Sequence, residues 1–450
     1  MKSERIRAWK DKKEEQLKHK EPDARQLQSQ YKYWRSRCSA LYDQITVHKI
    51  QCSGNVTSSK WLPGRPGKEQ GPQRFIVSAT DSRDGSDILT YTVSMGYDDP
   101  EGEIQAELEK LVYCDGEVEE VTCMPQNPDI IAARCQECDR GVRFYDLSEV
   151  KSLSSGSKNK RSRVRTSEEE GYIGSYCLKN FSSTSVSWNP NREGQLLTSC
   201  KEGEMYLWDV TTLLKGGEDN GRYLTRFSVG NPITGVDWSK GNDFLFGSTA
   251  ENGSLCLWDK RTEKKVTEVI AHQGRATGFQ FNPLETNIAA TCGSDALVKI
   301  WDTRMPKEAK SVLKWHNSEV SQIAWASFNK DAIASGGFDR RVAVWDMRKI
   351  GTKQNAEEAL DGPPELLFVH GGHTAPIVGI DWNPLKEHSW LNLSSASDGR
   401  LQIWRMSGFL YDPQRRKHIK KLFKACSKRK RKRTTSMDTS EADKKNAKEN

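Results

Sequence analysis

An all-β fold, a seven-bladed WD-repeat β-propeller, is predicted for this chain by a tandem repeat and by the strands that the repeat contains. The repeat is marked by four Trp-Asp pairs at intervals of 50, 43 and 44 residues. Each pair ends a short apolar segment, which is typical of a β-strand. Sheets of a few such strands cannot bury both faces alone, so successive sheets must stack in a ring. The pairs are Trp208-Asp209, Trp258-Asp259, Trp301-Asp302 and Trp345-Asp346.

Three of the later repeats share a second pattern of one His, one Asp and one Trp, with six residues from the Asp to the Trp. A buried Asp can stay ionised where it accepts hydrogen bonds from turn amides and from a His. Because the same set recurs in successive repeats, we expect these residues to be structural rather than catalytic. The sets are His272, Asp295 and Trp301; His316, Asp339 and Trp345; and His373, Asp398 and Trp404.

The remaining blades are predicted from apolar segments that precede Trp208 and are bounded by turn residues. We assign residues 60–63, 74–80 and 88–93 to the first blade, 124–128 and 144–146 to the second, and 188–190 to the third. The total is seven blades. Such a ring usually closes by pairing a strand from one terminus with strands from the other, which fits the position of residues 401–404 near the C-terminus.

The predicted organisation is one propeller with extensions at both ends. Its parts are a basic N-terminal extension (1–22), an N-terminal helix (23–48), the propeller (55–407, with insertions at about 151–180 and 349–368) and a basic, mostly disordered tail (408–450). The insertion at 151–180 is rich in Ser and in basic residues, and we expect it to be a disordered loop.

The positive charge of the chain belongs to its tail. The net charge of the 450 residues is +8, but residues 415–433 alone contain twelve Lys or Arg and no acid, so the rest of the chain has a net charge of −4. The tail includes a compact run of the type that nuclear import receptors or nucleic-acid phosphates bind. Alternatively, it is a solvated segment without a specific partner. The run is Lys428, Arg429, Lys430, Arg431, Lys432 and Arg433.

Eleven cysteines are present without a framework of close pairs, and we find no apolar signal sequence and no apolar run of 18 residues. We therefore expect an intracellular protein without membrane contact. The motifs of phosphate loops and nucleophiles are absent, so we expect no enzymatic activity, catalytic residue or cofactor. Cys135 and Cys138 form a lone CxxC pair, for which a strand-connecting turn is a better interpretation than a metal site.

An amphipathic helix is predicted from about Ala24 to Ile45. Asp23 is a plausible N-cap, because Gln26 lies three residues after it. The apolar stripe of the helix must bury against another surface, and packing on the side of the ring accounts for most of it. An edge left open would form the wall of a groove. The stripe contains Leu27, Tyr31, Trp34, Cys38, Leu41 and Ile45.

The interval from Trp345 to Trp404 is 59 residues, which indicates an insertion in the last repeat. Its second half carries acidic residues beside an apolar segment, and a Pro pair stiffens the backbone between them. An acidic rim around an apolar floor suits a basic amphipathic helix. Alternatively, the insertion is a solvated connection in which Leu367 and Phe368 start a strand. The acids are Glu357, Glu358, Asp361 and Glu365, followed by Leu366, Leu367 and Phe368.

These segments resemble the retinoblastoma-associated histone-binding WD-repeat family, the small shared subunits of chromatin assembly factor and of histone acetyltransferase, deacetylase and Polycomb complexes. The resemblance covers about residues 28–406 and is most specific over 361–374, with further agreement at 31–43, 61–63, 124–132 and 245–248. It implies a nuclear histone chaperone or scaffold that binds histone H4, as part of H3–H4, and recruits it to such complexes.

The resemblance also implies where histones bind. The first helix of histone H4 would occupy a side groove between the N-terminal helix and the double-proline loop. Its residues would be Leu27, Tyr31, Trp34, Leu41, Glu357, Glu358, Asp361, Pro363, Pro364, Leu366, Phe368 and Val369. A second family site, at the top of the central channel, takes the tail of histone H3 and would use Glu117, Glu119 and Glu319.

The chain departs from the family in two places. Ser182, Thr184 and Thr234 stand where acidic or aromatic residues of the channel site are expected. Residues 51–55 replace a Glu-Trp-Pro-Ser-Leu segment that follows the helix in the family. The side groove is therefore the better supported of the two sites.

Two other functions remain open. Arg261, Arg304 and Arg348 follow three of the Trp-Asp pairs, as in substrate receptors of cullin-type ubiquitin ligases, although an Arg at this place can simply pair with the Asp. The basic ends of the chain are also compatible with a ribosome-assembly WD protein. Direct binding of nucleic acid is expected at most through the tails, because basic residues are not interleaved with aromatic ones.

Overall fold

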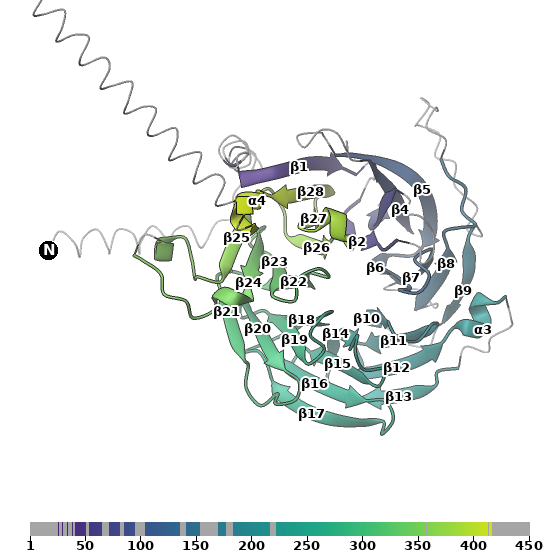
Figure 1. Ribbon diagram of the computed structural model, residues 1–450. Coiled ribbons are helices and arrows are strands. Elements are labelled where there is room, and N and C mark those ends of the chain that lie inside the picture. The colour runs from purple at the N-terminus through teal and green to yellow at the C-terminus, as the bar shows by residue number, and fades with distance from the viewer. Residues whose placement is uncertain are drawn as a thin grey trace, which may run out of the picture.

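Figure 1 shows the computed structural model of the chain, which is a closed ring of β-sheets. The structure describes Gln26, Ser29, Trp34 and Cys38 and the ranges 41–50, 54–64, 72–81, 85–94, 104–135, 141–153, 170–176, 183–216, 222–356, 358–412 and 414–415. These residues form seven four-stranded antiparallel sheets, the blades of a propeller. The predicted all-β, seven-bladed fold is confirmed.

Each of the first three blades runs from an inner strand at the channel to an outer strand at the rim. The first contains β2 (Val56–Leu62), β3 (Gln73–Asp81), β4 (Gly85–Ser94) and β5 (Gln105–Asp115). The second contains β6 (Val118–Cys123), β7 (Ile130–Cys135), β8 (Val142–Asp146) and β9 (Tyr172–Tyr176). The third contains β10 (Ser183–Trp188), β11 (Gln195–Cys200), β12 (Glu204–Asp209) and β13 (Thr225–Ser228), with the short helix α3 (Thr211–Leu214) before β13.

The next three blades repeat this plan. They contain β14 (Ile233–Trp238), β15 (Leu245–Ala250), β16 (Ser254–Asp259) and β17 (Lys264–Ile270); β18 (Ala276–Phe281), β19 (Ile288–Gly293), β20 (Leu297–Asp302) and β21 (Ser311–Lys314); and β22 (Val320–Trp325), β23 (Ala332–Gly337), β24 (Val342–Asp346) and β25 (Leu366–His370). The 3-10 turns η2 (Met347–Lys349) and η3 (Glu358–Leu360) lie between β24 and β25.

The seventh blade joins the two ends of the chain. It contains β26 (Ile377–Trp382), β27 (Leu391–Ala396) and β28 (Arg400–Met406), with η4 (Lys386–His388) before β27 and helix α4 (Gly408–Tyr411) after β28. Its outer strand is β1 (Tyr42–Lys49), which pairs antiparallel with β28 so that Ile45 faces Trp404. The prediction that strands from the two termini close the ring is therefore confirmed.

The strand β1 corrects the prediction of a helix that continues to residues 45–48. Gln26, Ser29, Trp34 and Cys38 are helical, but the chain is extended from Tyr42 onwards. The residues Ile45-Thr46-Val47 are all β-branched, which favours a strand. Without β1, the strand β28 would present an unpaired edge. Pairing with β28 therefore decides the conformation of this segment, although its apolar residues have a helical spacing.

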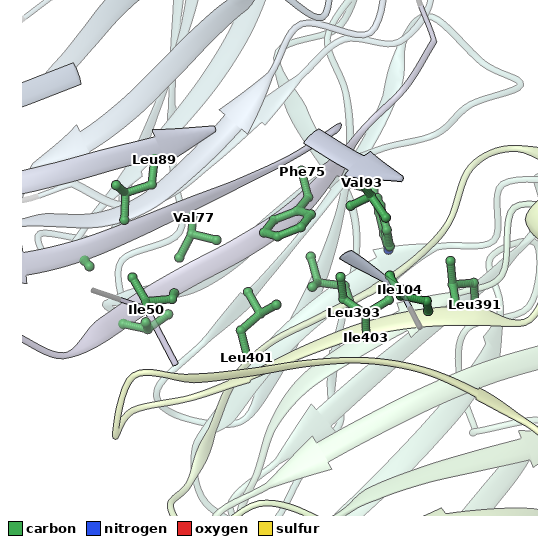
Figure 2. Close-up of a cluster of buried hydrophobic side chains, with 13 residues drawn as sticks. Ile50, Phe75, Val77, Leu89, Val93, Ile104, Leu391, Leu393, Leu401 and Ile403 are labelled. Atoms are coloured by element: carbon green, nitrogen blue, oxygen red, sulfur yellow. The ribbon is translucent and has the colours of Figure 1, made fainter. Parts of the chain in front are cut away.

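The core is distributed between the blades rather than concentrated at one centre. Figure 2 shows the cluster between the seventh and the first blade, where Leu391, Leu393, Leu401 and Ile403 of the former meet Phe75 and other side chains of the latter. This packing joins the last blade to the first across the closure of the ring. Stacking of adjacent blades thus buries the sheet faces, as the repeat pattern predicts.

The tryptophan that ends each later repeat is fixed by a hydroxyl on the neighbouring strand. In each case the buried indole Nε1–H donates to a Ser or Thr ten residues earlier, at 2.8–3.0 Å. The indole therefore keeps its hydrogen bond although its ring is buried. The pairs are Trp208 with Thr198, Trp258 with Ser248, Trp301 with Thr291, Trp345 with Ser335, and Trp404 with Ser394.

The repeated histidines extend these pairs into networks. His272 Nδ1 lies 2.8 Å from Asp295 Oδ1, and its Nε2 lies 2.8 Å from the hydroxyl of Thr291. His316 makes the equivalent contacts with an Asp and a Ser, which confirms that these histidines are structural. In the seventh blade, His373 keeps only the contact with Ser394, at 2.7 Å, while Asp398 accepts a hydrogen bond from Thr374 instead.

Both predicted insertions are shorter than expected, because each contains the outer strand of a blade. The strand β9 lies within the segment 151–180, and residues 154–169 of that segment lie outside the described residues. The strand β25 begins at Leu366, within the segment 349–368. Leu367 and Phe368 therefore belong to a strand, as the second alternative expects, and this strand begins one residue earlier.

Inner strands are linked around the channel by side chains that accept backbone N–H groups of the next blade. Asp237 accepts from Phe281 at 2.9 Å, Gln280 from Trp325 at 2.8 Å, and Asp381 from Trp61 at 2.8 Å. The last of these bonds joins the seventh blade to the first. Burial raises the pKa of the Asp381 carboxyl to about 6, although Trp61 and Lys60 oppose the shift.

We predict that Asp381→Asn stabilises the protein at pH 8. Above the folded pKa, ionisation of the buried carboxyl opposes folding by up to about 3 kcal/mol, whereas well below the unfolded pKa of 3.8 the group is protonated in both states and contributes no penalty. The amide oxygen of Asn can still accept the N–H of Trp61. Urea denaturation at several pH values should show a gain that is largest above pH 6, falls as the pH is lowered and vanishes below the unfolded pKa. A gain that does not depend on pH would contradict this account.

Candidate functional site

The N-terminal helix is attached to the propeller where the sixth and seventh blades meet. The ring of Trp34 packs edge-on against Tyr42 of β1 and His370 of β25, with centroid distances of 5.8 and 5.5 Å. The backbone of Gly371 and Gly372 lies directly under its indole. Trp34 is thus half-buried and holds the helix over the outer strands of both blades.

An aromatic seam of Tyr42, Phe368, His370 and Trp404 lies beneath Trp34. The Tyr42 hydroxyl lies 2.8 Å from His370 Nδ1, and the His370 ring stacks on Trp404 at a centroid distance of 4.5 Å. Burial, together with the nearby His373, holds the pKa of His370 well below its usual value, so this imidazole is neutral and shares one hydrogen bond with the Tyr42 hydroxyl. The seam joins β1, β25 and β28.

Phe368 belongs to this seam and is not the floor of an open groove. Its side chain is only 7% exposed and packs in the core with Trp404 and Tyr42. Phe368 thus supports the surface from beneath, and its contact with a ligand stays a prediction. Strand alternation explains its burial, because Leu367 and Val369 on either side of it are half-buried and Val369 pairs with Ala343.

The loop between β24 and β25, residues 347–365, is held in place by its own hydrogen bonds. Asn355 and Glu358 cap each other, since each side chain accepts the backbone N–H of the other residue, at 2.8 and 3.3 Å. Gln354 donates to the carbonyl of Gly362 at 3.1 Å. Gly362 has a φ of 133°, which suits glycine, and it covers Leu366 and Trp315. The loop therefore has a defined shape.

This loop presents one apolar side chain and two carboxylates to solvent. Leu360 is 86% exposed, and Glu358 and Asp361 on either side of it are exposed as well. Neither carboxylate forms an ion pair with any residue that the structure describes. Glu365, by contrast, is only 8% exposed, so it does not belong to an acidic rim.

The other residues of the predicted groove have mixed positions. Leu41 lies at the end of the helical segment and is 45% exposed. Pro363, Pro364 and Leu366 are half-buried at the start of β25, where the Leu366 N–H donates to the Pro363 carbonyl at 3.0 Å. Leu27, Tyr31 and Glu357 lie outside the described residues, as do Lys428, Arg429, Lys430, Arg431, Lys432 and Arg433.

The central channel contains a cavity of about 620 Å³, lined by the inner strands of all seven blades. Its lining includes Glu119 and Glu319 but not Glu117. Glu119 forms an ion pair with Arg134, and Glu120 pairs with Lys60 at 3.1 Å. Acidic and basic groups are therefore nearly balanced in the channel, and two of its carboxylates are already neutralised.

Sequence reasoning missed Phe338, an exposed aromatic residue that lines the channel. It follows β23 in a turn, and its N–H donates to the Glu319 carbonyl at 2.9 Å. The sequence could have indicated this exposure, because Phe338 directly precedes Asp339 of a repeated histidine set. That Asp is expected in a turn, and a turn exposes its side chains.

The structure offers simpler roles for other motifs. Arg261, Arg304 and Arg348 each form an ion pair with the Asp of their own Trp-Asp pair, at 2.5, 2.6 and 2.9 Å, so local pairing accounts for this arginine.

Cys135 is buried in β7 with its sulfur 3.7 Å from that of Cys114, and Cys138 lies outside the described residues. Within the described ranges, His, Cys, Asp and Glu do not gather in groups of three that could hold a metal. Nor does any helix there have the length and apolar character needed to cross a membrane.

We predict that Gly372→Ala destabilises the attachment of the helix whereas Gly371→Ala does not. A Cβ at Gly372 would lie 2.7 Å from Trp34 Cη2 and 2.6 Å from Gln402 Oε1, while a Cβ at Gly371 would meet only ordinary contacts at 3.4 Å. Overpacking of this kind costs about 1–3 kcal/mol. Urea denaturation and hydrogen exchange of the helix should show the loss for Gly372→Ala alone. Equal effects of the two substitutions would refute the packing described for Trp34.

Comparison with known families agrees with this architecture. Residues 221–259, 263–302, 307–346 and 364–405 each match the WD domain, G-beta repeat. Each match after the first begins at or near the outer strand of one blade and ends with the third strand of the next, so the repeat is offset by one strand from the blade. This offset leaves the seventh blade without an outer strand until β1 supplies it. WD40 propellers are usually scaffolds for protein partners. The chain is therefore an all-β, seven-bladed propeller built with WD40 repeats.

Proposed function

We propose that this propeller is a histone-binding scaffold that takes the first helix of histone H4 on its side, between the N-terminal helix and the loop 347–365. The observation that carries the proposal is the exposure of Leu360 between two exposed carboxylates on a loop of defined shape. A lone exposed leucine is ordinary on a protein surface, and Leu360 supports the proposal because it stands between two exposed carboxylates on a loop of defined shape.

The chemistry of this surface selects a basic amphipathic helix. Leu360 and the half-buried Leu366 offer apolar contacts, and Glu358 and Asp361 offer carboxylates that form no ion pair with another described residue. A helix with one apolar face and flanking Arg or Lys satisfies both requirements, because its cations gain charge-assisted hydrogen bonds. Leu41, the residue before β1, is a further exposed apolar side chain, and we assign it to the helix side of the binding surface.

The identity of the partner rests on the resemblance to the retinoblastoma-associated family over residues 361–374 and 31–43. On that basis, the protein delivers H3–H4 to chromatin assembly, acetyltransferase, deacetylase or Polycomb-type complexes in the nucleus. The run 428–433 would serve as its import signal. The channel is a weaker candidate for the H3 tail, because Glu119 is already paired with Arg134.

We predict that replacing Glu357, Glu358 and Asp361 together with Lys abolishes binding of a peptide of the first helix of H4. The substituted loop would repel the basic side of the peptide, and repulsion of like charges across an interface costs several kcal/mol. Fluorescence anisotropy with a labelled peptide measures the loss. The thermal melt should change little, because the described members of this set are on the surface and the only described hydrogen bond that is lost is the long one from the Asn355 N–H to Glu358, at 3.3 Å.

A matched control carries Glu193→Lys and Glu308→Lys, two exposed acids in loops of other blades. This variant raises the net charge by 4, against 6 for the triple variant, and should retain binding. A third variant, Leu360→Asp, should lose binding through the apolar contact while making the loop more acidic. Undiminished binding in the triple variant, or equal loss in the control, would exclude the side surface.

A further inference from the structure

We infer that residues 416–426 of the C-terminal tail are an intramolecular ligand of the same side surface and compete there with an external basic helix. This inference rests on the proposed function of that surface. It is carried by the place where the tail leaves the propeller and by the sequence of its first residues.

The chain is fixed to the propeller up to Arg415. Arg415 forms an ion pair with Asp43 at the start of β1, at 2.8 Å, and the same carboxylate accepts the N–H of Gly408 at 3.0 Å. The Tyr411 ring stacks on Trp390 at a centroid distance of 4.5 Å. Trp390 adopts a φ of 67°, unusual for a large side chain, and thereby places its indole between Tyr411 and Trp382.

These contacts position the tail beside the strand that follows the loop. Leu410 and Tyr411 of α4 pack on the same core cluster as Leu367 of β25. Figure 1 shows α4 next to β25, at the rim from which the loop between β24 and β25 projects. The described chain therefore ends on the Leu367 side of β25, the strand that the loop 347–365 enters, and the tail follows from this side of the ring.

The sequence of this part of the tail has the chemistry that the surface requires. Ile419, Leu422, Phe423 and Cys426 are spaced by 3, 1 and 3 residues, which corresponds to one face of a helix. The residues between and around them are basic, and acidic residues are absent. The basic residues are Arg416, Lys417, Lys420, Lys421 and Lys424.

Attachment gives the tail an advantage over a partner in solution. A ligand on a short flexible linker acts at an effective concentration of about 1 mM, so a tail that binds with a Kd of about 0.1 mM would weaken an external peptide about 10-fold. A partner that binds more tightly displaces the tail, which then becomes free for other contacts. Only a partner whose affinity exceeds that of the attached tail therefore occupies the surface.

The test compares the full chain with a chain that ends at Arg415, which keeps Asp43, Tyr411 and α4 intact. We expect the shortened chain to bind the H4 peptide about 10-fold more tightly. A full-length variant with Leu422→Asp and Phe423→Asp should gain the same affinity. Replacing residues 428–433 with Gln should leave the affinity unchanged, because that run lies beyond the amphipathic segment. Equal affinities of the full and the shortened chain would overturn the inference.

A synthetic peptide of residues 416–426 separates this inference from the proposed function. The peptide should bind the shortened chain in trans and lose binding when Leu360→Asp or the triple Lys substitution is introduced. If it binds and the H4 peptide does not, the assignment to histones fails while the intramolecular contact stands. If the H4 peptide binds and the tail peptide does not, the contact is refuted and the proposed function stands.

Discussion

The pairing of β1 with β28 is the interaction on which the rest of the structure depends. Because the sequence repeat is offset by one strand from the blade, the last repeat ends at β28 and leaves an open edge. Ring closure therefore requires a strand from the N-terminal side, and Tyr42–Lys49 supplies it. The same requirement fixes the position of whatever precedes that strand. The N-terminal helix lies on the side of the propeller because the strand that follows it closes the ring.

The closure and the proposed binding surface share residues. Tyr42 is the first residue of β1, and its hydroxyl contacts His370 at the end of β25, the strand that the loop 347–365 enters. Trp34 rests on both of these residues. A substitution in the aromatic seam would therefore alter the packing of β1 against β28, the attachment of Trp34 and the strand that the loop enters. The helix and the loop consequently have fixed places relative to one another, which a preformed surface for a rigid helical ligand needs.

Sequence patterns predicted the features that repeat and missed those that depend on one tertiary contact. The Trp-Asp pairs and the histidine sets recur, so the blades and the roles of His272 and His316 followed from spacing alone. The segment ending at Ile45 satisfied a helical period locally, and only the open edge of β28, far away in the sequence, makes it a strand. The burial of Phe368 depends on its place in β25, where alternation decides which side chains point inwards, and Glu365 lies just before that strand with its carbonyl bonded to the Asp346 N–H. The exposure of Leu360, by contrast, agrees with the polar composition of its loop.

Electrostatics explain why a basic partner would prefer the rim to the channel. In the channel, Glu119 and Glu120 already face Arg134 and Lys60, so a cation that enters must compete with fixed side chains and lose its own hydration. On the loop, Glu358 and Asp361 are solvated and lack an ion pair among the described residues, so a cation arrives without displacing another. Exposed ion pairs are individually weak. Such carboxylates therefore favour a partner of positive charge but contribute little to its affinity. Affinity must come from apolar contact, for which Leu360 is the most exposed large apolar side chain in the described part of the chain.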